Sequence, residues 1–269
     1  MRLSPLTRAL LGAFTALALV FVYLPLSLVL LNSFNTSRAF AWPPPGLTTR
    51  WWSQAWSSDG ARSAIVVSLE VAAIATVVAL VLGTMAAMAL HRFRFFGRDT
   101  VSLLIILPIA LPGVVTGIAL ANAFTTMLGL ELGFLTVVVS HATFCIVTVF
   151  NNAIARMRRL GTTLEDASAD LGAGTFTTFR LVTLPMLRSA LLAGGLLSFA
   201  LSFDEIIVTT FTAGSGVTTL PIWIYQNLFR PNQAPVVNVV AAALIVLSIL
   251  PIWLAQRLAG TDESVAAAR

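Results

Sequence analysis

The chain has 269 residues, of which 58% are hydrophobic and only 10% are charged. A soluble globular domain carries about 25% charged residues, so this composition, with a mean hydropathy of +0.92, excludes one. All sixteen basic residues are arginines, and the formal net charge is +5 at pH 7. A phosphate-binding loop of the form GxxxxGK[ST] requires a lysine. ATP hydrolysis by that route is therefore excluded, and any ATPase is a separate chain.

Six continuous apolar runs divide the chain. Each has about 20 residues, which at 1.5 Å per residue spans the roughly 30 Å hydrocarbon core of a bilayer. Strands of a membrane barrel would alternate in polarity instead. The runs cover residues 10–31, 64–90, 101–127, 135–155, 190–212 and 236–258. We therefore predict an all-α polytopic membrane protein with six transmembrane helices, organised as a single permease domain over residues 1–269.

The arginines are distributed unevenly between the two sides of the membrane. With the N-terminus placed inside, twelve fall on the inner side, and only Arg38, Arg50, Arg62 and Arg230 fall outside. The positive-inside rule then places both termini in the cytoplasm. The first run is longer than the core of a signal peptide, and no small-residue cleavage site follows it, so we expect it to remain as an anchor.

The first outer segment, residues 32–63, is longer than a turn requires. Three consecutive prolines, Pro43 to Pro45, precede Trp51, Trp52 and Trp56. This order predicts an extended stretch followed by an aromatic helix at the membrane interface. The helix either anchors the chain in the interface or forms a docking surface for an external partner.

The inner segment, residues 156–189, has the pattern of a helical hairpin. Thr162 and Glu165 have the spacing of a capping box, which predicts a helix start there. The helix should end by Gly172 or Gly174, where glycine permits a left-handed turn. A second short helix is expected over residues 175–182, before Leu184 and Pro185 redirect the chain into the fifth span.

The same segment resembles the EAA loop, E-A-A-x3-G-x9-I-x-L-P, of ABC importer permeases. Asp166, Ala167 and Ser168 occupy the E-A-A positions, and Gly172 occupies the glycine position. Val182, Leu184 and Pro185 match I-x-L-P. Further stretches, residues 108–113 and residues 201–205 followed by 210–214, are similar to the permeases of spermidine/putrescine-type importers, and the similarity extends over nearly all six spans.

This resemblance implies the fold and the partners of a type I importer. Two permease chains, here expected to differ, would assemble with a dimer of ABC ATPases and a periplasmic or lipid-anchored substrate-binding protein. ATP would be bound by the ATPase subunits, so no cofactor is expected on this chain. Membrane lipids are expected to contact the chain as well. Nucleic acid is not expected, because the positions of the arginines follow the membrane rule.

In this family the EAA helix sits in a groove of the ATPase and transmits nucleotide-driven closure to the spans. The resemblance therefore implies a coupling role for seven residues of this loop. They are Glu165, Asp166, Ala167, Ser168, Gly172, Leu184 and Pro185.

Three acidic residues, Glu70, Asp204 and Glu205, lie within apolar runs. An ionised carboxylate at the centre of a bilayer costs about 3 kcal/mol even on the lenient insertion scale. If the second run enters at residue 64 and the fifth leaves near residue 212, Glu70 and Glu205 lie roughly 9 and 10 Å from the outer surface. That shared depth places them where a binding protein would deliver a cationic substrate. Glu70 can alternatively snorkel to the interface.

Polar residues recur along the fifth run with helical spacing. If the helix is continuous, they share one face, which we expect to line a cavity. The members of this face are Ser198, Ser202, Glu205, Thr209 and Thr212. Asp204 is turned about 100° away and is expected to pair with a neighbouring helix or the partner permease. The predicted substrate pathway comprises Glu70, Ser202, Asp204, Glu205 and Thr209.

Two other patterns have alternative interpretations. Pro108, Pro112, Gly113 and Gly117 should distort the third span, giving a hinge or a wide cavity, or only ordinary transmembrane packing. His141 and Cys145 share one face of the fourth span, and without further ligands they indicate a packed interior rather than a metal or thiol site. A single cysteine also excludes an internal disulfide.

The sequence thus predicts an inner-membrane permease subunit of an ATP-driven importer for a small cationic solute, with a polyamine as the expected substrate. Another amine, an aminophosphonate or a metal cation remains open as the substrate. The rival interpretation is a proton-coupled secondary transporter that uses Glu70, Asp204 and Glu205 as a relay. An intramembrane enzyme based on His141 is a more distant alternative.

Overall fold

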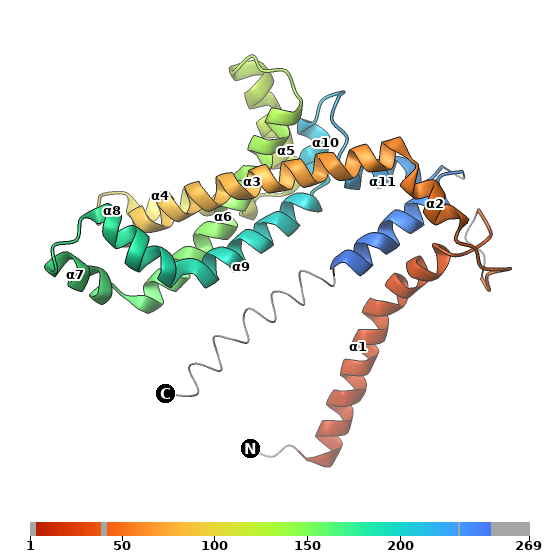
Figure 1. Cartoon of the computed structure of the whole chain (residues 1–269), viewed down its shortest axis with the longest axis horizontal. Helices are drawn as coiled ribbons and strands as arrows, with labels where there is room; N and C mark the ends of the chain where they lie inside the picture. Colours follow the sequence, from red (N-terminus) through yellow and green to blue (C-terminus); the bar gives the residue numbers. More distant parts are fainter. Residues whose placement is uncertain (1–3, 39–41, 231, 249–269) are drawn as a thin grey trace. The chain divides into compact units, whose positions relative to one another are not determined.

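A computed structural model describes residues 4–38, 42–230 and 232–248. These residues form two compact units. One comprises the described residues up to 62 together with those from 224 onward, and the other comprises residues 63–223. Each unit is described by itself, and Figure 1 gives the order of the elements along the chain. The single permease domain expected from the sequence stays a prediction.

In the first unit, α1 (Pro5–Asn32) is apolar on every side and buries none of its residues against the chain. It begins at Ser4, whose hydroxyl accepts a hydrogen bond from the Thr7 backbone N–H, and has Pro5 in its first turn. A helix of 28 residues that is apolar all round and has no fully buried residue suits a surrounding of lipid or of other protein. The first predicted span is therefore confirmed as a helix.

The expected aromatic helix in the outer segment is α2 (Arg50–Trp56). Trp51 is only 3% exposed, and its indole N–H donates to the Asn35 backbone oxygen over 2.8 Å. Trp56 is 80% exposed. The tryptophans therefore have different roles, because Trp51 holds its own loop together and Trp56 is left for an environment outside the chain. A last helix, Ala234–Ser248, lies in the sixth predicted span, and residues 249–258 of that span lie outside the described residues.

The second unit is built around α6 (Phe134–Leu160), which packs against α9 (Leu184–Phe203) and against α3 (Asp59–Arg92) (Figure 1). In the most apolar 18-residue stretch of each helix, 61% of α6 is buried, against 28% of α3. Small residues permit close approach. A Cβ on Gly83 would lie 2.9 Å from the Ile146 oxygen, and one on Gly194 would lie 3.3 Å from the Val149 Cα. Close backbone approach at small residues is how transmembrane helices associate without a hydrophobic driving force.

The third predicted span is broken. It consists of α4 (Arg98–Ala110) and α5 (Gly113–Asn122), the latter continued by a π-helical turn, η1 (Ala123–Met127), and the two parts are bent by 107°. Pro112 at the break has no N–H to donate, and Leu111 before it is extended, with φ −84° and ψ 146°, as a residue preceding proline prefers. The predicted distortion is confirmed, and it falls at Pro112, whereas Pro108 is accommodated inside α4.

The prediction of a continuous fifth helix over residues 190–212 is wrong. The helix α9 ends at Phe203, and a separate short helix, α10 (Ile207–Thr212), follows it. At the other end, α8 (Thr175–Thr178), a π-helical turn, η2 (Phe179–Thr183), and α9 follow one another without a break as one helix. Pro185 therefore does not redirect the chain as predicted. Pro185 has no N–H to donate to a helical hydrogen bond. The π-helical turn just before it accommodates this missing bond within the helix.

Among the described residues, four helices are long and apolar enough to cross a membrane, or five if the bent α4–α5 pair counts as one span. The remaining helix, α11 (Leu220–Leu228), has no counterpart among the predicted elements. The helical class of the fold is confirmed at this level.

Candidate functional site

The inner hairpin consists of α7 (Thr163–Asp170), a turn at Leu171 to Gly174, and α8. The helix α7 begins directly after Thr162 and ends two residues before Gly172, as predicted. The capping box is not formed, because the Thr162 side chain makes no cap hydrogen bond. The Glu165 carboxylate instead accepts a hydrogen bond of 2.6 Å from the Thr183 hydroxyl.

Two side-chain hydrogen bonds join the arms of the hairpin. Thr183 donates to Glu165, and the Ser168 and Thr178 hydroxyls lie 3.0 Å apart. Thr178 and Thr183 are buried, whereas Glu165 and Ser168 are half-buried. The second arm is continuous with α9, so α7 is fixed to the helix that enters the membrane region. A displacement of α7 would therefore be transmitted to α9.

Gly172 is required for the turn by its backbone and not by lack of space. Its φ is +83°, and a Cβ added there would meet nothing within 4 Å. Its N–H donates to the Ala169 oxygen and the next N–H, of Ala173, donates to the Ser168 oxygen, which closes α7 in the manner of a glycine-terminated helix. The predicted helix stop is therefore present in the structure.

The hairpin exposes large apolar side chains in a segment that is otherwise polar. Leu171 is 89% exposed and Phe176 is 74% exposed, and Leu164 and Leu181 are also exposed. Exposed apolar side chains of this kind are typical of a surface that contacts another protein or a membrane. The motif residues Asp166, Ala167, Leu184 and Pro185 are exposed as well.

The breaks in the third and fifth spans lie against each other. A Cβ on Gly113, just after the first break, would lie 3.4 Å from a methyl of Ile207, just after the second. One turn further, a Cβ on Gly117 would lie 2.7 Å from the Phe211 ring, so glycine is needed there for α5 and α10 to pack. The two stretches that resemble importer permeases are thus brought together.

At the second break, the two acidic residues have different surroundings. Glu205 is half-buried, and its carboxylate accepts a hydrogen bond of 2.8 Å from the Val208 backbone N–H, which caps the start of α10. Asp204 is exposed, and none of the described residues contacts its carboxylate through a hydrogen bond or ion pair. Asp204 is therefore the carboxylate at this break that is available to a ligand or another chain.

The polar face of the fifth span does not line a cavity as predicted, because it packs against α6. His141, fully buried on α6, joins both sides of the break: its Nδ1 lies 2.7 Å from Ser202 Oγ and its Nε2 lies 2.8 Å from Thr209 Oγ1. Since Thr209 donates its only hydroxyl hydrogen to the Glu205 backbone oxygen, Nε2 of His141 carries the proton and Nδ1 accepts from Ser202.

Further hydrogen bonds extend this contact along α6. The Thr136 hydroxyl donates to the Thr212 oxygen over 2.7 Å, and Ser198 and Cys145 exchange side-chain hydrogen bonds with each other's backbone oxygens. The six side chains that form these hydrogen bonds between α6 and the helices α9 and α10 are called the polar ladder below. They are Thr136, His141, Cys145, Ser198, Ser202 and Thr209.

Glu70 lies on an exposed face of α3, eleven residues after its start at Asp59. The helix begins five residues earlier than predicted, which places Glu70 about 16 Å along it. None of the described residues forms an ion pair with Glu70.

The sequence indicated most of the coupling segment but not the role of His141. Its position four residues before Cys145 indicated packing alone, and the bridging function required knowing where the fifth helix breaks. Among the described residues, no group of three or more His, Cys, Asp or Glu side chains could hold a metal ion.

Residues 79–260 match the family of binding-protein-dependent transport system inner membrane components. The chain is 34% identical over 252 residues to the spermidine/putrescine transport system permease protein PotC of Escherichia coli K12, covering 94% of each chain. It is 35% identical over 236 residues to the putrescine transport system permease protein PotI of the same organism, covering 85% of this chain and 83% of that one.

Solved structures agree in fold. A bacterial ABC transporter involved in the import of the acidic polysaccharide alginate superposes with a TM-score of 0.71 at 14% identity, covering 97% of this chain and 99% of that one. The inward-facing MetNI methionine ABC transporter gives a TM-score of 0.57 at 18% identity, covering 74% and 92%.

The chain belongs to the family of binding-protein-dependent transport system inner membrane components, the permease subunits of ABC importers. It is a multi-pass membrane protein and a transport subunit rather than an enzyme. Membership implies a separate ATPase and a substrate-binding protein as partners. The predicted family is therefore confirmed.

Proposed function

We propose that this chain is the permease subunit of an ATP-driven polyamine importer of the bacterial inner membrane. The names of its relatives support spermidine or putrescine as the substrate class. The proposal includes six transmembrane helices, cytoplasmic termini, a second and different permease chain, an ATPase dimer and a periplasmic or lipid-anchored binding protein. The observation that carries it is the hairpin, whose arms are joined and whose apolar residues are exposed.

The mechanism follows from what the hairpin joins. The ATPase covers the exposed apolar residues of α7 and α8, and nucleotide-driven closure displaces α7. Because Glu165 is bonded to Thr183, this displacement moves a helical rod that runs from Thr175 to Phe203, about 44 Å long. The rod ends at Phe203, directly before Asp204, so motion at the ATPase reaches the break beside α5 and α10.

At the break, the carboxylates contribute to the pathway in unequal ways. Asp204 is exposed and attracts a cation, while Glu205 holds the start of α10 through Val208. Ser202 and Thr209 act through His141, which joins the two halves of the span. Glu70 supplies a second exposed carboxylate on α3. Weak contacts suit transport, because a tightly held cation would leave slowly.

Uptake by reconstituted vesicles tests the proposed function. Vesicles that contain this permease with its partner permease, ATPase and binding protein should accumulate labelled putrescine or spermidine only with ATP, and a protonophore should have no effect. Uptake that needs no ATPase and collapses with the protonophore would instead establish a proton-coupled secondary transporter. An assay with a metal cation, an aminophosphonate and another amine distinguishes the remaining substrates.

A pair of isosteric variants tests the pathway. Asp204→Asn removes an exposed charge, and we expect cation uptake to fall about five-fold, equivalent to about 1 kcal/mol. Glu205→Gln retains an oxygen acceptor for the Val208 N–H, so its effect on uptake should be smaller. Both are compared at equal membrane abundance. Unchanged uptake in Asp204→Asn would remove this residue from the pathway.

Single cysteines test the orientation. In a Cys145→Ala background, Thr163→Cys lies in the hairpin and Ser215→Cys lies after α10. An impermeant thiol reagent should label the second variant in intact cells and the first only after the membrane is opened. Labelling of the first variant alone in intact cells would invert the proposed topology.

A further inference from the structure

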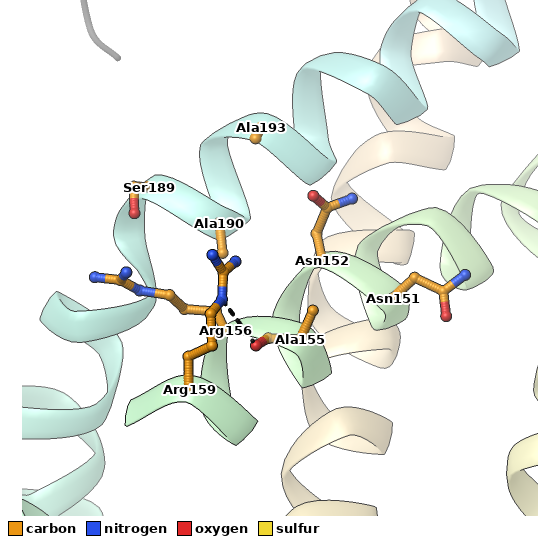
Figure 2. Close-up of a pocket in the computed structure, with 8 residues that line it drawn as sticks. All are labelled: Asn151, Asn152, Ala155, Arg156, Arg159, Ser189, Ala190 and Ala193. Atoms are coloured by element: carbon orange, nitrogen blue, oxygen red, sulfur yellow. Dashed lines mark hydrogen bonds between the residues drawn. The ribbon is translucent and has the colours of Figure 1, made fainter. Parts of the chain in front are cut away.

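A polar pocket lies between α6 and α9, in the second unit. Its volume is about 470 Å³, and it is open on one side (Figure 2). The eight residues around it come from the last part of α6 and the first part of α9, and two of them are arginines. They are Asn151, Asn152, Ala155, Arg156, Arg159, Ser189, Ala190 and Ala193.

Three of the lining residues have small side chains, Ala155 on α6 and Ala190 and Ala193 on α9. All eight lining residues are half-buried or exposed. The pocket is thus a hollow on the surface between the two helices. The proposed topology places it at the inner surface of the membrane, since the apolar run of α6 ends at residue 155 and arginines follow.

Each arginine makes one hydrogen bond through its Nε. Arg156 Nε donates to the Met186 backbone oxygen on α9 over 3.2 Å, and Arg159 Nε donates to the Ala155 backbone oxygen over 3.3 Å. Their terminal nitrogens have no hydrogen-bond partner or carboxylate among the described residues. These donors are therefore available to a group outside the chain.

The other polar groups complete a donor-rich lining. Asn152 bonds through its amide nitrogen to the Thr148 oxygen, while the Ser189 hydroxyl and the Asn151 amide have no hydrogen-bond partner among the described residues. None of the eight lining residues carries a carboxylate. Two guanidinium forks, amides and a hydroxyl without a negative counter-charge match the oxygens of a phosphate.

We propose that this pocket binds the phosphodiester head group of an anionic phospholipid from the cytoplasmic leaflet. Basic pockets between membrane helices on the cytoplasmic side suit such head groups. The leaflet rests on the proposed topology, whereas binding of the head group does not. The bound lipid fixes α6 against α9 close to the coupling hairpin.

Lipid binding to the full-length chain in detergent tests this directly. Native mass spectrometry with phosphatidylglycerol and phosphatidylcholine of identical acyl chains should give about five-fold tighter binding of the anionic lipid, equivalent to about 1 kcal/mol. Both lipids carry the phosphodiester, but the quaternary ammonium of phosphatidylcholine cancels its net charge and is repelled by the two arginines. Equal binding of the two lipids would overturn the proposal. So would displacement of phosphatidylglycerol by millimolar inorganic phosphate, which would identify a free anion as the ligand.

Two variants with matched controls locate the site. Arg159→Gln removes one guanidinium, and Ala193→Leu fills the pocket while keeping both arginines. Each should weaken phosphatidylglycerol binding about five-fold. Arg158→Gln and Ala200→Leu, on the same helices but outside the lining, should leave it unchanged.

Equal losses in the variants and their controls would overturn the site. If Arg159→Gln kept its lipid and instead lost the ATPase subunit from the purified complex, the pocket would belong to a protein contact and the lipid proposal would be wrong. Failure of uptake with lipid binding intact would count against the proposed transport function only, because the lipid measurement needs neither ATP nor substrate.

Discussion

The inner hairpin and the polar ladder are both rich in hydroxyl groups, yet they differ in whether their side chains make all their contacts within the chain. In the polar ladder, the side chains of His141 and its neighbours are buried and hydrogen-bonded within the chain. In the hairpin, the hydroxyls join the two arms while Leu171 and Phe176 are exposed. A region whose buried polar groups are all hydrogen-bonded within the chain maintains the fold, whereas exposed apolar surface is expected to contact a partner.

The largest effect on the hairpin is expected from Gly172→Asp. The backbone there has φ +83°, which costs any L residue about 1–2 kcal/mol, and the added carboxylate would face the ATPase. Binding-protein-stimulated ATP hydrolysis should be lost while the permease remains inserted. Gly97→Asp is a matched control, since Gly97 has φ +84° and equally open space but lies outside the hairpin. Equal loss in both variants would reduce the effect to backbone strain.

For the polar ladder, His141→Leu should give a large loss of stability and no specific loss of coupling. It leaves the Ser202 hydroxyl buried without its acceptor and breaks the contact with Thr209, which costs about 2–4 kcal/mol in unfolding free energy. Thermal unfolding of the full-length chain in detergent measures this. Thr143→Val, which removes only a hydrogen bond within α6, should be nearly neutral. A His141→Leu protein of normal stability would refute the structural role.

Replacement of Phe176 by serine should give the opposite result. The side chain is exposed, so stability should hold, whereas affinity for the ATPase should fall about ten-fold if Phe176 is an anchor of that interface. Phe96→Ser, also at a fully exposed phenylalanine but between α3 and α4, is the control. Similar ATPase affinity in the two variants would place the partner elsewhere.

A smaller effect is expected from Thr183→Val, which removes the hydrogen bond to Glu165. We expect a loss of about 1 kcal/mol and a modest decrease in stimulated ATPase activity, because Ser168 and Thr178 still join the arms. Thr177→Val changes an exposed threonine of the same helix and should have no effect. Unchanged stimulation in both variants would show that the Glu165 contact does not transmit motion.

These two regions also differ in how far the sequence predicts them. The hairpin depends on local signals, namely the Thr162–Glu165 spacing and the position of Gly172, and the bounds of α7 agree with the prediction. The second arm, predicted over residues 175–182, instead continues into α9. The break at Asp204 has no comparable local signal, because no proline or glycine lies between Ser202 and Thr209. The break is supported by Glu205 capping α10 and by His141 from another helix, contacts that periodicity cannot anticipate.

The same distinction explains the prediction about the polar face. Helical spacing correctly grouped Ser198, Ser202, Thr209 and Thr212 on one side, since all four are buried on the α6 side. Periodicity identifies a shared face but not what covers it, because a water-filled pathway and a polar neighbouring helix require the same residue types. At Pro112 the signal was local, and the predicted distortion is present.

The most direct test of the account is a photo-crosslinker at Phe176 in cells that express the whole importer. The account predicts a covalent adduct between the permease and the ATPase subunit at this position, which weakens when Gly172→Asp is introduced, and no such adduct from a crosslinker at Met127, an exposed residue at the end of η1. An ATPase adduct from Met127 but not from Phe176 would contradict the coupling role of the hairpin.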